Sequence, residues 1–240
     1  MSEANTNSFT ARLKDNSFPD SIQNQVYLDE VKPRFRFREK PIYDAIKRVF
    51  DIVFSLTAIT VLLPLMIIIS IIIMIDDFGN PIFIQKRIGK NGKEFWMIKF
   101  RSMYKNAEDK REELMHKNEA DGPIFKIKDD PRVTRVGKYI RRMSLDEILQ
   151  FFNVLQGSMA IIGPRPFVTY EQEKFNKYQS QRLYVKPGLS CYWQIYGRSD
   201  TSFEKLIEYD LKYIMERGLI TDIKIIILTI MAIIQSQGAY

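Results

Sequence analysis

The chain contains 240 residues, of which 45% are hydrophobic and 27% are charged, and its formal net charge is +7 at pH 7. A single cysteine, Cys191, excludes an internal disulfide framework, and a single histidine, His116, excludes a zinc site built on several His or Cys ligands. The positive balance suits a partner that carries phosphate, whether lipid, nucleotide or nucleic acid. Because the chain has only one cysteine and one histidine, its chemistry is expected to use carboxylates, arginines and lysines.

Residues 1–40 are predicted to form a polar and basic tail. Residues 1–30 are rich in Asn, Ser, Asp and Gln and are expected to be mobile. A basic cluster follows, consisting of Lys32, Arg34, Arg36, Arg38, Lys40, Lys47 and Arg48. Such a cluster beside a membrane segment attracts anionic lipid head groups, at about 1 kcal/mol per residue. A solvated charged arm and a nucleic-acid arm are the alternatives, and the neighbouring apolar segment favours the lipid.

A membrane segment is predicted over residues 41–78, because residues 52–75 carry no charged side chain. As a helix this run would be about 36 Å long, enough to cross a hydrocarbon core of about 30 Å. Basic residues flank both ends, which opposes a spanning orientation, and Pro64 favours a kink near the middle. We expect a re-entrant helix-break-helix on the cytoplasmic side. A kinked spanning helix is the main alternative, and the run is too long for a secretory signal.

Residues 79–240 are expected to be one cytosolic, membrane-associated domain. Gly89-Lys90-Asn91-Gly92 separates two apolar runs and predicts a β-hairpin. Helices are predicted over residues 104–117, 133–142, 202–217 and 220–234, the last one too short for a span and suited to an interfacial or core position. Trp96 and Trp193 are interpreted as packing or membrane-interface residues. The predicted fold class is α+β and mainly helical.

The chemistry is concentrated in residues 141–155. Ser144 followed by Glu147 matches a capping box at a helix start, and capping alone would explain both residues. However, two arginines lie just upstream and an Arg-containing Gly-Pro segment lies just downstream. An adjacent pair of carboxylates can hold Mg²⁺ together with substrate phosphate oxygens, and a carboxylate can attack phosphorus to form an acyl phosphate. A catalytic Asp146 and a first-turn acid therefore both remain open from the residues alone.

The chain resembles the bacterial sugar transferases, the monotopic phosphoglycosyl transferases, over roughly residues 47–240. The resemblance rests on motifs that occur in order: Lys99-Phe100-Arg101-Ser102-Met103, Asp130-Pro131-Arg132-Val133-Thr134, Ser144-Leu145-Asp146-Glu147, Asn153-Val154-Leu155, Gly163-Pro164-Arg165-Pro166, Lys186-Pro187-Gly188-Leu189 and Gly197-Arg198. It implies Mg²⁺ dependence and an active site on the cytoplasmic face of the bacterial inner membrane. It also implies that a hexose-1-phosphate moves from a nucleotide diphosphate sugar to polyprenyl (undecaprenyl) phosphate through a covalent aspartyl intermediate.

By the same resemblance, Asp146 is the nucleophile and Glu147 is its partner in metal binding and acid-base work. Residues expected to contact phosphate or nucleotide are Lys99, Arg101, Arg141, Gly163, Pro164, Arg165, Pro166 and Arg198. Pro64 is expected to break the membrane helix. The motif around Arg198 and the closing Gly238-Ala239-Tyr240 are more similar to glucose and galactose phosphate transferases of exopolysaccharide, capsule or O-antigen synthesis. Cys191 stands where the family usually has glycine.

The sequence therefore predicts a transferase enzyme of the membrane surface, with a nucleotide sugar and polyprenyl phosphate as partners. A homo-oligomer is compatible with it. The alternative is a non-catalytic membrane scaffold of the polysaccharide assembly machinery, which the intact Asp146-Glu147 pair disfavours. A nucleic-acid partner is not expected, because the chain lacks a recognition-helix or stacking-platform signature.

Overall fold

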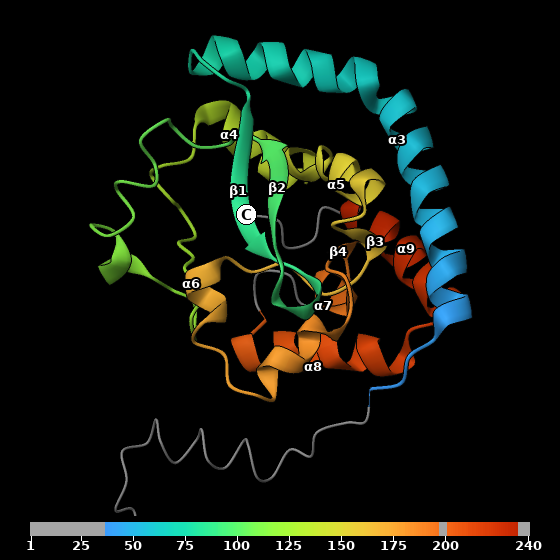
Figure 1. Ribbon diagram of the computed structural model, residues 1–240. Coiled ribbons are helices and arrows are strands. Elements are labelled where there is room, and N and C mark those ends of the chain that lie inside the picture. The colour runs from blue at the N-terminus through green and yellow to red at the C-terminus, as the bar shows by residue number, and fades with distance from the viewer. Residues whose placement is uncertain (1–36, 197–200, 235–240) are drawn as a thin grey trace, which may run out of the picture. The chain divides into compact units, whose positions relative to one another are not determined.

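A long bent helix, α3 (Pro41–Asp76), begins the well-defined part of the chain. The computed structural model describes residues 37–196 and 201–234, so the predicted mobile tail and its basic residues up to Arg36 lie outside the described residues. Pro64 lies inside α3, and Figure 1 shows that the ribbon changes direction sharply part-way along the helix. Judged by length and composition, α3 is the one helix among the described residues that could cross a membrane.

The sequence around Pro64 explains such a bend. A proline inside a helix removes one backbone hydrogen bond, and its ring clashes with the carbonyl four residues earlier. The hydroxyls of Thr57 and Thr60, which lie within two turns upstream of Pro64, donate to the carbonyls of Val53 and Leu56 at 3.0 and 2.9 Å. Such back-bonding also bends helices. The predicted interruption is therefore a bend within a continuous helix.

The first half of α3 is fastened to the rest of the chain by polar contacts. Arg48 donates to the carbonyls of Val154 and Leu155 at 2.6 and 2.8 Å, where helix α5 ends. Lys47 pairs with Asp222 at 3.1 Å. Lys47 and Arg48 were expected to attract lipid head groups as part of the basic cluster, and that expectation stays a prediction. In the structure Lys47 pairs with a carboxylate and Arg48 contacts two neutral carbonyls, because α3 folds back onto the domain.

The second half of α3 packs through apolar side chains at helical spacing. Met66, Ile69 and Ile73 are buried against a cluster that includes Phe100, Ile140 and Leu149. Between the two fastened regions the outward side chains remain exposed, with Val61 at 70%. At the end of the helix, Asp76 accepts a hydrogen bond from the Val136 N–H at 3.2 Å. Both ends of α3 thus contact the same body of residues.

The predicted β-hairpin is confirmed. Strands β1 (Ile82–Ile88) and β2 (Glu94–Phe100) pair antiparallel, and the short 3₁₀ turn η1 (Lys90–Gly92) joins them. Asn91 and Gly92 have φ values of 57° and 76°, the left-handed region that this dipeptide favours. Pairing places Phe83 opposite Lys99, Gln85 opposite Met97 and Arg87 opposite Phe95. Because side chains alternate along a strand, Lys99, Met97 and Arg87 share one face.

The predicted helix over residues 104–117 is wrong. This segment consists of successive turns with hydrogen bonds from residue i+3 to residue i, and only the 3₁₀ turn η2 (Met115–Lys117) is regular. Its charged composition offers little apolar surface for a helix to bury, and Ala107 is its only buried residue in the range. The next prediction holds: α4 (Arg135–Arg142) begins after Thr134, whose hydroxyl accepts from the Gly137 N–H at 2.9 Å.

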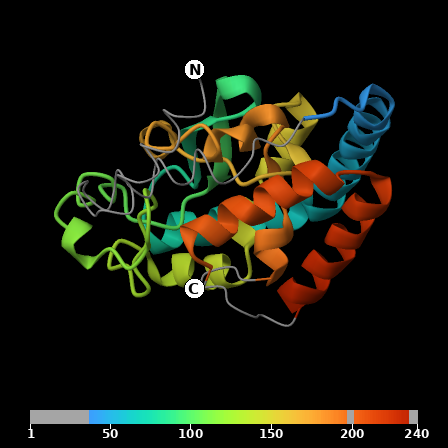
Figure 2. The same cartoon turned by 90° about the horizontal axis from the view of Figure 1, so that it is seen from below.

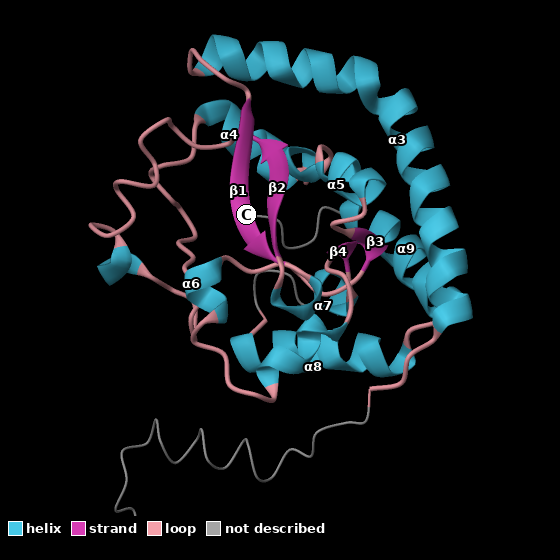
Figure 3. Ribbon diagram, viewed as in Figure 1, coloured by secondary structure: helices cyan, strands magenta, loops and turns pink. Residues whose placement is uncertain are grey.

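A parallel strand pair, which the sequence did not predict, joins distant parts of the chain. After η3 (Leu145–Glu147) and α5 (Gln150–Gln156), β3 (Ala160–Ile162) pairs with β4 (Gly188–Ser190). Figure 3 shows these short strands apart from the hairpin. Helix α6 (Thr169–Gln172), the 3₁₀ helix η4 (Gln179–Tyr184) and α7 (Tyr192–Tyr196) are short helices that come after β3 in the chain. Residues 175–181 cluster separately from residues 37–174 and 182–234 and are tied internally by Asn176 and Gln179.

The last two predicted helices are confirmed as α8 (Phe203–Glu216) and α9 (Leu219–Ile234), which meet at a sharp corner (Figure 2). Ser202 caps α8 by accepting from the Lys205 N–H. One side of α9 carries exposed apolar side chains, with Ile220 at 85% exposure, whereas Asp222 and Ile225 are buried. The described residues are therefore mainly helical, with a small sheet and one long apolar helix.

Candidate active site

Asp146 and Glu147 lie in the 3₁₀ turn η3, between α4 and α5. Ser144 precedes the turn with a φ of 55°, and its side chain forms no capping hydrogen bond. The predicted capping box is therefore wrong, because a left-handed residue directs the chain into a turn rather than into a regular first helical turn. Asp146 is only 9% exposed, whereas Glu147 is partly open to solvent. Capping consequently does not explain why two acids stand here.

The electrostatics of the turn set Asp146 apart from an ordinary surface carboxylate. Burial, followed by the negative charge of Glu147, raises the pKa of Asp146 from 3.8 to about 6, against the opposing pull of Lys99 and Arg141. Burial, followed by the charge of Arg87, lowers the pKa of Lys99 to about 8, and the two acids oppose that change. A partly desolvated carboxylate next to cations is the arrangement expected of a nucleophile that meets a phosphate group.

Cationic side chains from several elements surround the acidic pair. Lys99 comes from β2, and Arg141 comes from α4 and donates from Nε to the hydroxyl of Ser102 at 2.8 Å. Arg165 follows β3, and its guanidinium lies 3.7 Å from a Glu147 carboxylate oxygen. The same guanidinium lies 5.0 Å from the centre of the Trp193 ring. Segments far apart in sequence thus place three positive charges about two carboxylates.

A small cavity of about 30 Å³ lies beside Glu147, Lys99 and Arg165, and Asp146 and Arg141 are not among its lining residues. Its lining combines polar and charged groups from the hairpin, η3, α5 and the loop after β3 with apolar groups from β2, β4 and α7. The lining residues are Arg87, Met97, Lys99, Glu147, Gln150, Arg165, Pro166, Gly188, Leu189 and Trp193. Cavities lined by a few convergent polar groups, with perturbed pKa values nearby, are the usual location of an active site.

Arg87 is a component of the site that sequence reasoning missed. Its guanidinium donates to the Pro166 carbonyl at 3.2 Å and lies 3.9 Å from Glu171. Burial, together with the charge of Arg165, lowers its pKa to about 10. The hairpin register contained the signal, because it places Arg87 on the same face as Lys99.

The Gly-Pro segment contributes to the site in two ways. Gly163 and Gly188 let two backbones approach closely, since a Cβ on Gly188 would lie 2.1 Å from the Gly163 nitrogen. Beyond them, Arg165 and Pro166 reach the cavity. Arg182 donates to the Arg165 carbonyl and pairs with the buried Asp210 at 2.5 Å, which anchors this loop from behind. Gly163 and Pro164 therefore shape the loop, whereas Arg165 lines the cavity.

Residues 42–236 match the family described as bacterial sugar transferase. The chain belongs to this family. It is 36% identical to the exopolysaccharide production protein ExoY of Sinorhizobium fredii, over 84% of this chain and 91% of ExoY. It is 45% identical to the galactosyl transferase CpsE of Streptococcus agalactiae over 68% of this chain, but over only 36% of CpsE. The undecaprenyl-phosphate galactose phosphotransferase of Salmonella typhimurium is 38% identical over 81% of this chain and 42% of its own length.

Some of the predicted site residues do not lie with Asp146 and Glu147. Arg101 is engaged elsewhere, because it forms an ion pair of 3.0 Å with Asp77, just after α3, and donates to the Asp77 carbonyl. Arg198 lies outside the described residues. Pro64 lies in α3, as expected. The Asp130-Pro131-Arg132 motif forms a buried ion pair of 2.7 Å that holds the loop before α4.

The acidic pair limits which metal the site could hold. Within the described residues no group of three or more His, Cys, Asp or Glu side chains could hold a metal ion, so a cage made only of protein ligands is absent from that part of the chain. Mg²⁺ binds through one or two carboxylates and completes its shell with water and substrate phosphate oxygens. Two adjacent carboxylates beside several cations fit that preference.

Proposed function

We propose that this chain is a phosphoglycosyl transferase that moves a hexose-1-phosphate from a nucleotide diphosphate sugar to polyprenyl phosphate. The observation that carries the proposal is the buried Asp146, which lies beside Glu147 and near Lys99 and Arg141 in a member of the bacterial sugar transferase family. Relatives are named as undecaprenyl-phosphate galactose phosphotransferase and as UDP-glucose:undecaprenyl-phosphate glucose-1-phosphate transferase. Their names support UDP-glucose or UDP-galactose as the donor type.

In the first step, a carboxylate oxygen of Asp146 attacks the phosphorus that bears the sugar. A new bond forms between that carboxylate oxygen and phosphorus, which gives an acyl phosphate, and the bond from that phosphorus to the bridging oxygen breaks. The nucleoside monophosphate leaves with that oxygen and the electron pair. Because the pKa of Asp146 is about 6, most of this carboxyl is ionised at pH 7 and ready to attack. The nearby Lys99 and Arg165 offset the charge of the phosphates.

In the second step, a phosphate oxygen of the polyprenyl phosphate attacks the same phosphorus. The bond to Asp146 breaks, the carboxylate is restored, and a polyprenyl diphosphate sugar results. Glu147 is partly exposed beside Arg165 and is placed to help orient the phosphates. Asp146 and Glu147 would hold Mg²⁺, and the bound ion would supply positive charge that neutralises the phosphate oxygens.

The contacts of α3 support a re-entrant membrane helix rather than a spanning one. Arg48 near its start and Met66 to Ile73 near its end all contact the same folded body. A helix that crossed the bilayer would have to separate one of these ends from that body by the membrane thickness. In the re-entrant arrangement, the exposed apolar side chains around Val61 enter the membrane. The flanking basic residues favour the cytoplasmic face of the bacterial inner membrane.

The experiment is a transfer assay with purified protein. It uses Mg²⁺, undecaprenyl phosphate and a panel of sugar nucleotides labelled in the β-phosphate, and the lipid product is analysed. We expect label in the lipid with at least one UDP-hexose, and label on the protein when the lipid is withheld. Absence of lipid product with every donor would contradict the proposal and favour the scaffold. Initiation of exopolysaccharide, capsule or O-antigen synthesis is the role that follows from such a product.

A further inference from the structure

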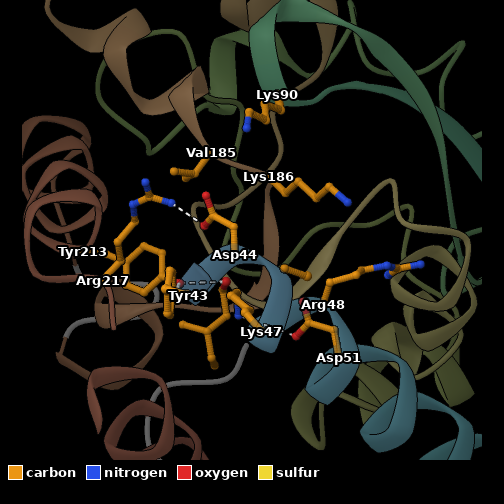
Figure 4. Close-up of a pocket in the computed structure, with 12 residues that line it drawn as sticks. Tyr43, Asp44, Lys47, Arg48, Asp51, Lys90, Val185, Lys186, Tyr213 and Arg217 are labelled. Atoms are coloured by element: carbon orange, nitrogen blue, oxygen red, sulfur yellow. Dashed lines mark hydrogen bonds and ion pairs between the residues drawn. The ribbon is translucent and has the colours of Figure 1, made fainter. Parts of the chain in front are cut away.

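A second cavity, of about 100 Å³, lies where the start of α3 meets the β3–β4 pair and the end of α8 (Figure 4). It shares no lining residue with the cavity beside Glu147. Its volume is several times that needed to hold one water molecule. Basic side chains dominate its charged lining, namely Lys47, Arg48, Lys90, Lys186 and Arg217, against Asp44 and Asp51.

The two carboxylates of this cavity already have partners. Asp44 pairs with Arg217 at 2.7 Å, which Figure 4 shows as a dashed line. Asp51 accepts from the Ile161 N–H at 3.1 Å and pairs with Lys47 at 3.5 Å. Lys47 is also 3.1 Å from Asp222. Among the described residues no ion pair joins Arg48, Lys90 or Lys186 to a carboxylate, although Asp51 and Asp44 lie close enough to act on Lys186.

All three of these cations line the cavity, and two of them, Arg48 and Lys186, lie close together. Arg48 donates to two carbonyls at the end of α5, which are neutral groups. A Cβ built on Gly157 would lie 3.1 Å from Arg48 Nη2 and 3.6 Å from Lys186 Nζ, so two positive groups share one spot. In Figure 4 both side chains extend toward the same side, whereas the Lys90 side chain, on the hairpin turn, points to the other side of the cavity. Burial, followed by the charge of Arg48, lowers the pKa of Lys186, and Lys90 adds to this effect, whereas Asp51 and Asp44 oppose it.

We propose that Arg48, Lys90 and Lys186 form a second anion site that binds a phosphate group and is separate from the catalytic cluster. A phosphate offers charged oxygens to several cations at once and would relieve their mutual repulsion. The phosphate can come from an anionic phospholipid head group or from free phosphate in solution. The exposed apolar side chains of Ile42 and Ile46 on the first turns of α3 favour the head group. The inference does not depend on the transferase activity.

The backbone links this site to the catalytic loop. Lys186 directly precedes Pro187 and Gly188, and the Lys186 carbonyl would lie 2.5 Å from a Cβ on Gly163. An anion bound to the Lys186 side chain would therefore restrict the motion of β4, whose Gly188 and Leu189 line the cavity beside Glu147. Anion binding at this site would therefore act on the backbone next to the active site.

The test compares the full chain with Lys90→Gln/Lys186→Gln. The matched control is Lys93→Gln/Lys110→Gln, which removes the same charge from two exposed residues that do not line the cavity. In detergent, the Tm is followed against inorganic phosphate, with chloride at equal ionic strength as the reference. In nanodiscs, native mass spectrometry counts phosphatidylglycerol retained from mixtures with phosphatidylcholine.

We expect the cavity variant to need about tenfold more phosphate for the same Tm rise, or to retain less phosphatidylglycerol, whereas the control behaves like wild type. A loss confined to the phosphate arm identifies free phosphate as the ligand, and a loss confined to the lipid arm identifies the head group. Equal responses of both variants in both arms would overturn the proposal. So would a large Tm decrease of the cavity variant without any anion, because Lys186 would then be structural.

Discussion

Replacing Asp146 by Asn should separate catalysis from stability, because the same side chain affects both in opposite directions. The substitution keeps nearly the same volume and removes the negative charge. Without an anionic nucleophile no acyl phosphate can form, so we expect transfer to fall by several orders of magnitude. The label that stays on the wild-type protein when lipid is withheld should disappear.

The effect on stability follows from the raised pKa of Asp146. Between pH 3.8 and about 6 the folded protein retains a proton on Asp146 that the unfolded chain has released. The free energy of unfolding therefore falls as the pH rises through this window. At about 1.4 kcal/mol per pKa unit, the folded protein is less stable by on the order of 3 kcal/mol above the window. Asp146→Asn lacks this penalty and should be more stable than wild type by up to that amount at neutral pH.

Urea unfolding in detergent, repeated from about pH 4 to about pH 8, measures the difference. The two curves should lie together near pH 4, separate through pH 6 and then run parallel. Asp129→Asn, at an exposed position, is the matched control and should follow wild type throughout. A variant that is less stable than wild type at neutral pH would refute the electrostatic reasoning. A purified Asp146→Asn protein with near-normal transfer would refute the covalent mechanism.

Four further predictions test the site and the fold. Cysteines at Arg38 and Lys93 should both resist a membrane-impermeant thiol reagent in intact cells, with the native Cys191 buried, and labelling of one alone would show a spanning α3. Ser144→Ala should change the free energy of unfolding by less than the loss of about 1 kcal/mol typical of a removed cap, because the Ser144 side chain caps no helix. Arg87→Lys should lower kcat/KM for the sugar nucleotide by about tenfold through lost guanidinium contacts, whereas Lys86→Gln should not. Gly188→Ala should reduce the free energy of unfolding by about 3 kcal/mol or more, since its Cβ meets backbone, whereas Gly218→Ala has only ordinary contact and should cost little.

The elements predicted correctly are those whose signals are local. The Asn91-Gly92 turn sets the hairpin, Thr134 and Ser202 cap α4 and α8, and the apolar run of α3 needs no distant partner to be helical. Asp146, Lys99 and Arg165 were also predicted from short ordered motifs, and their roles stay predictions. A sequence motif does not specify the distances between these side chains in the folded protein.

Tertiary structure decided how each charged side chain is used. The sequence alone does not distinguish Lys47 and Arg48 from any other pair of basic residues beside a membrane segment. In the fold, Lys47 pairs with a carboxylate and Arg48 donates to two carbonyls. Arg101 and Arg165 both stand in family motifs, and only Arg165 lines the cavity with Glu147. Ser144 matched a capping pattern, but the chain turns left-handed there. Helices and turns depend mainly on residues that are neighbours in sequence. Burial, ion pairing and the pKa of Asp146 depend on groups that only the folded chain brings together.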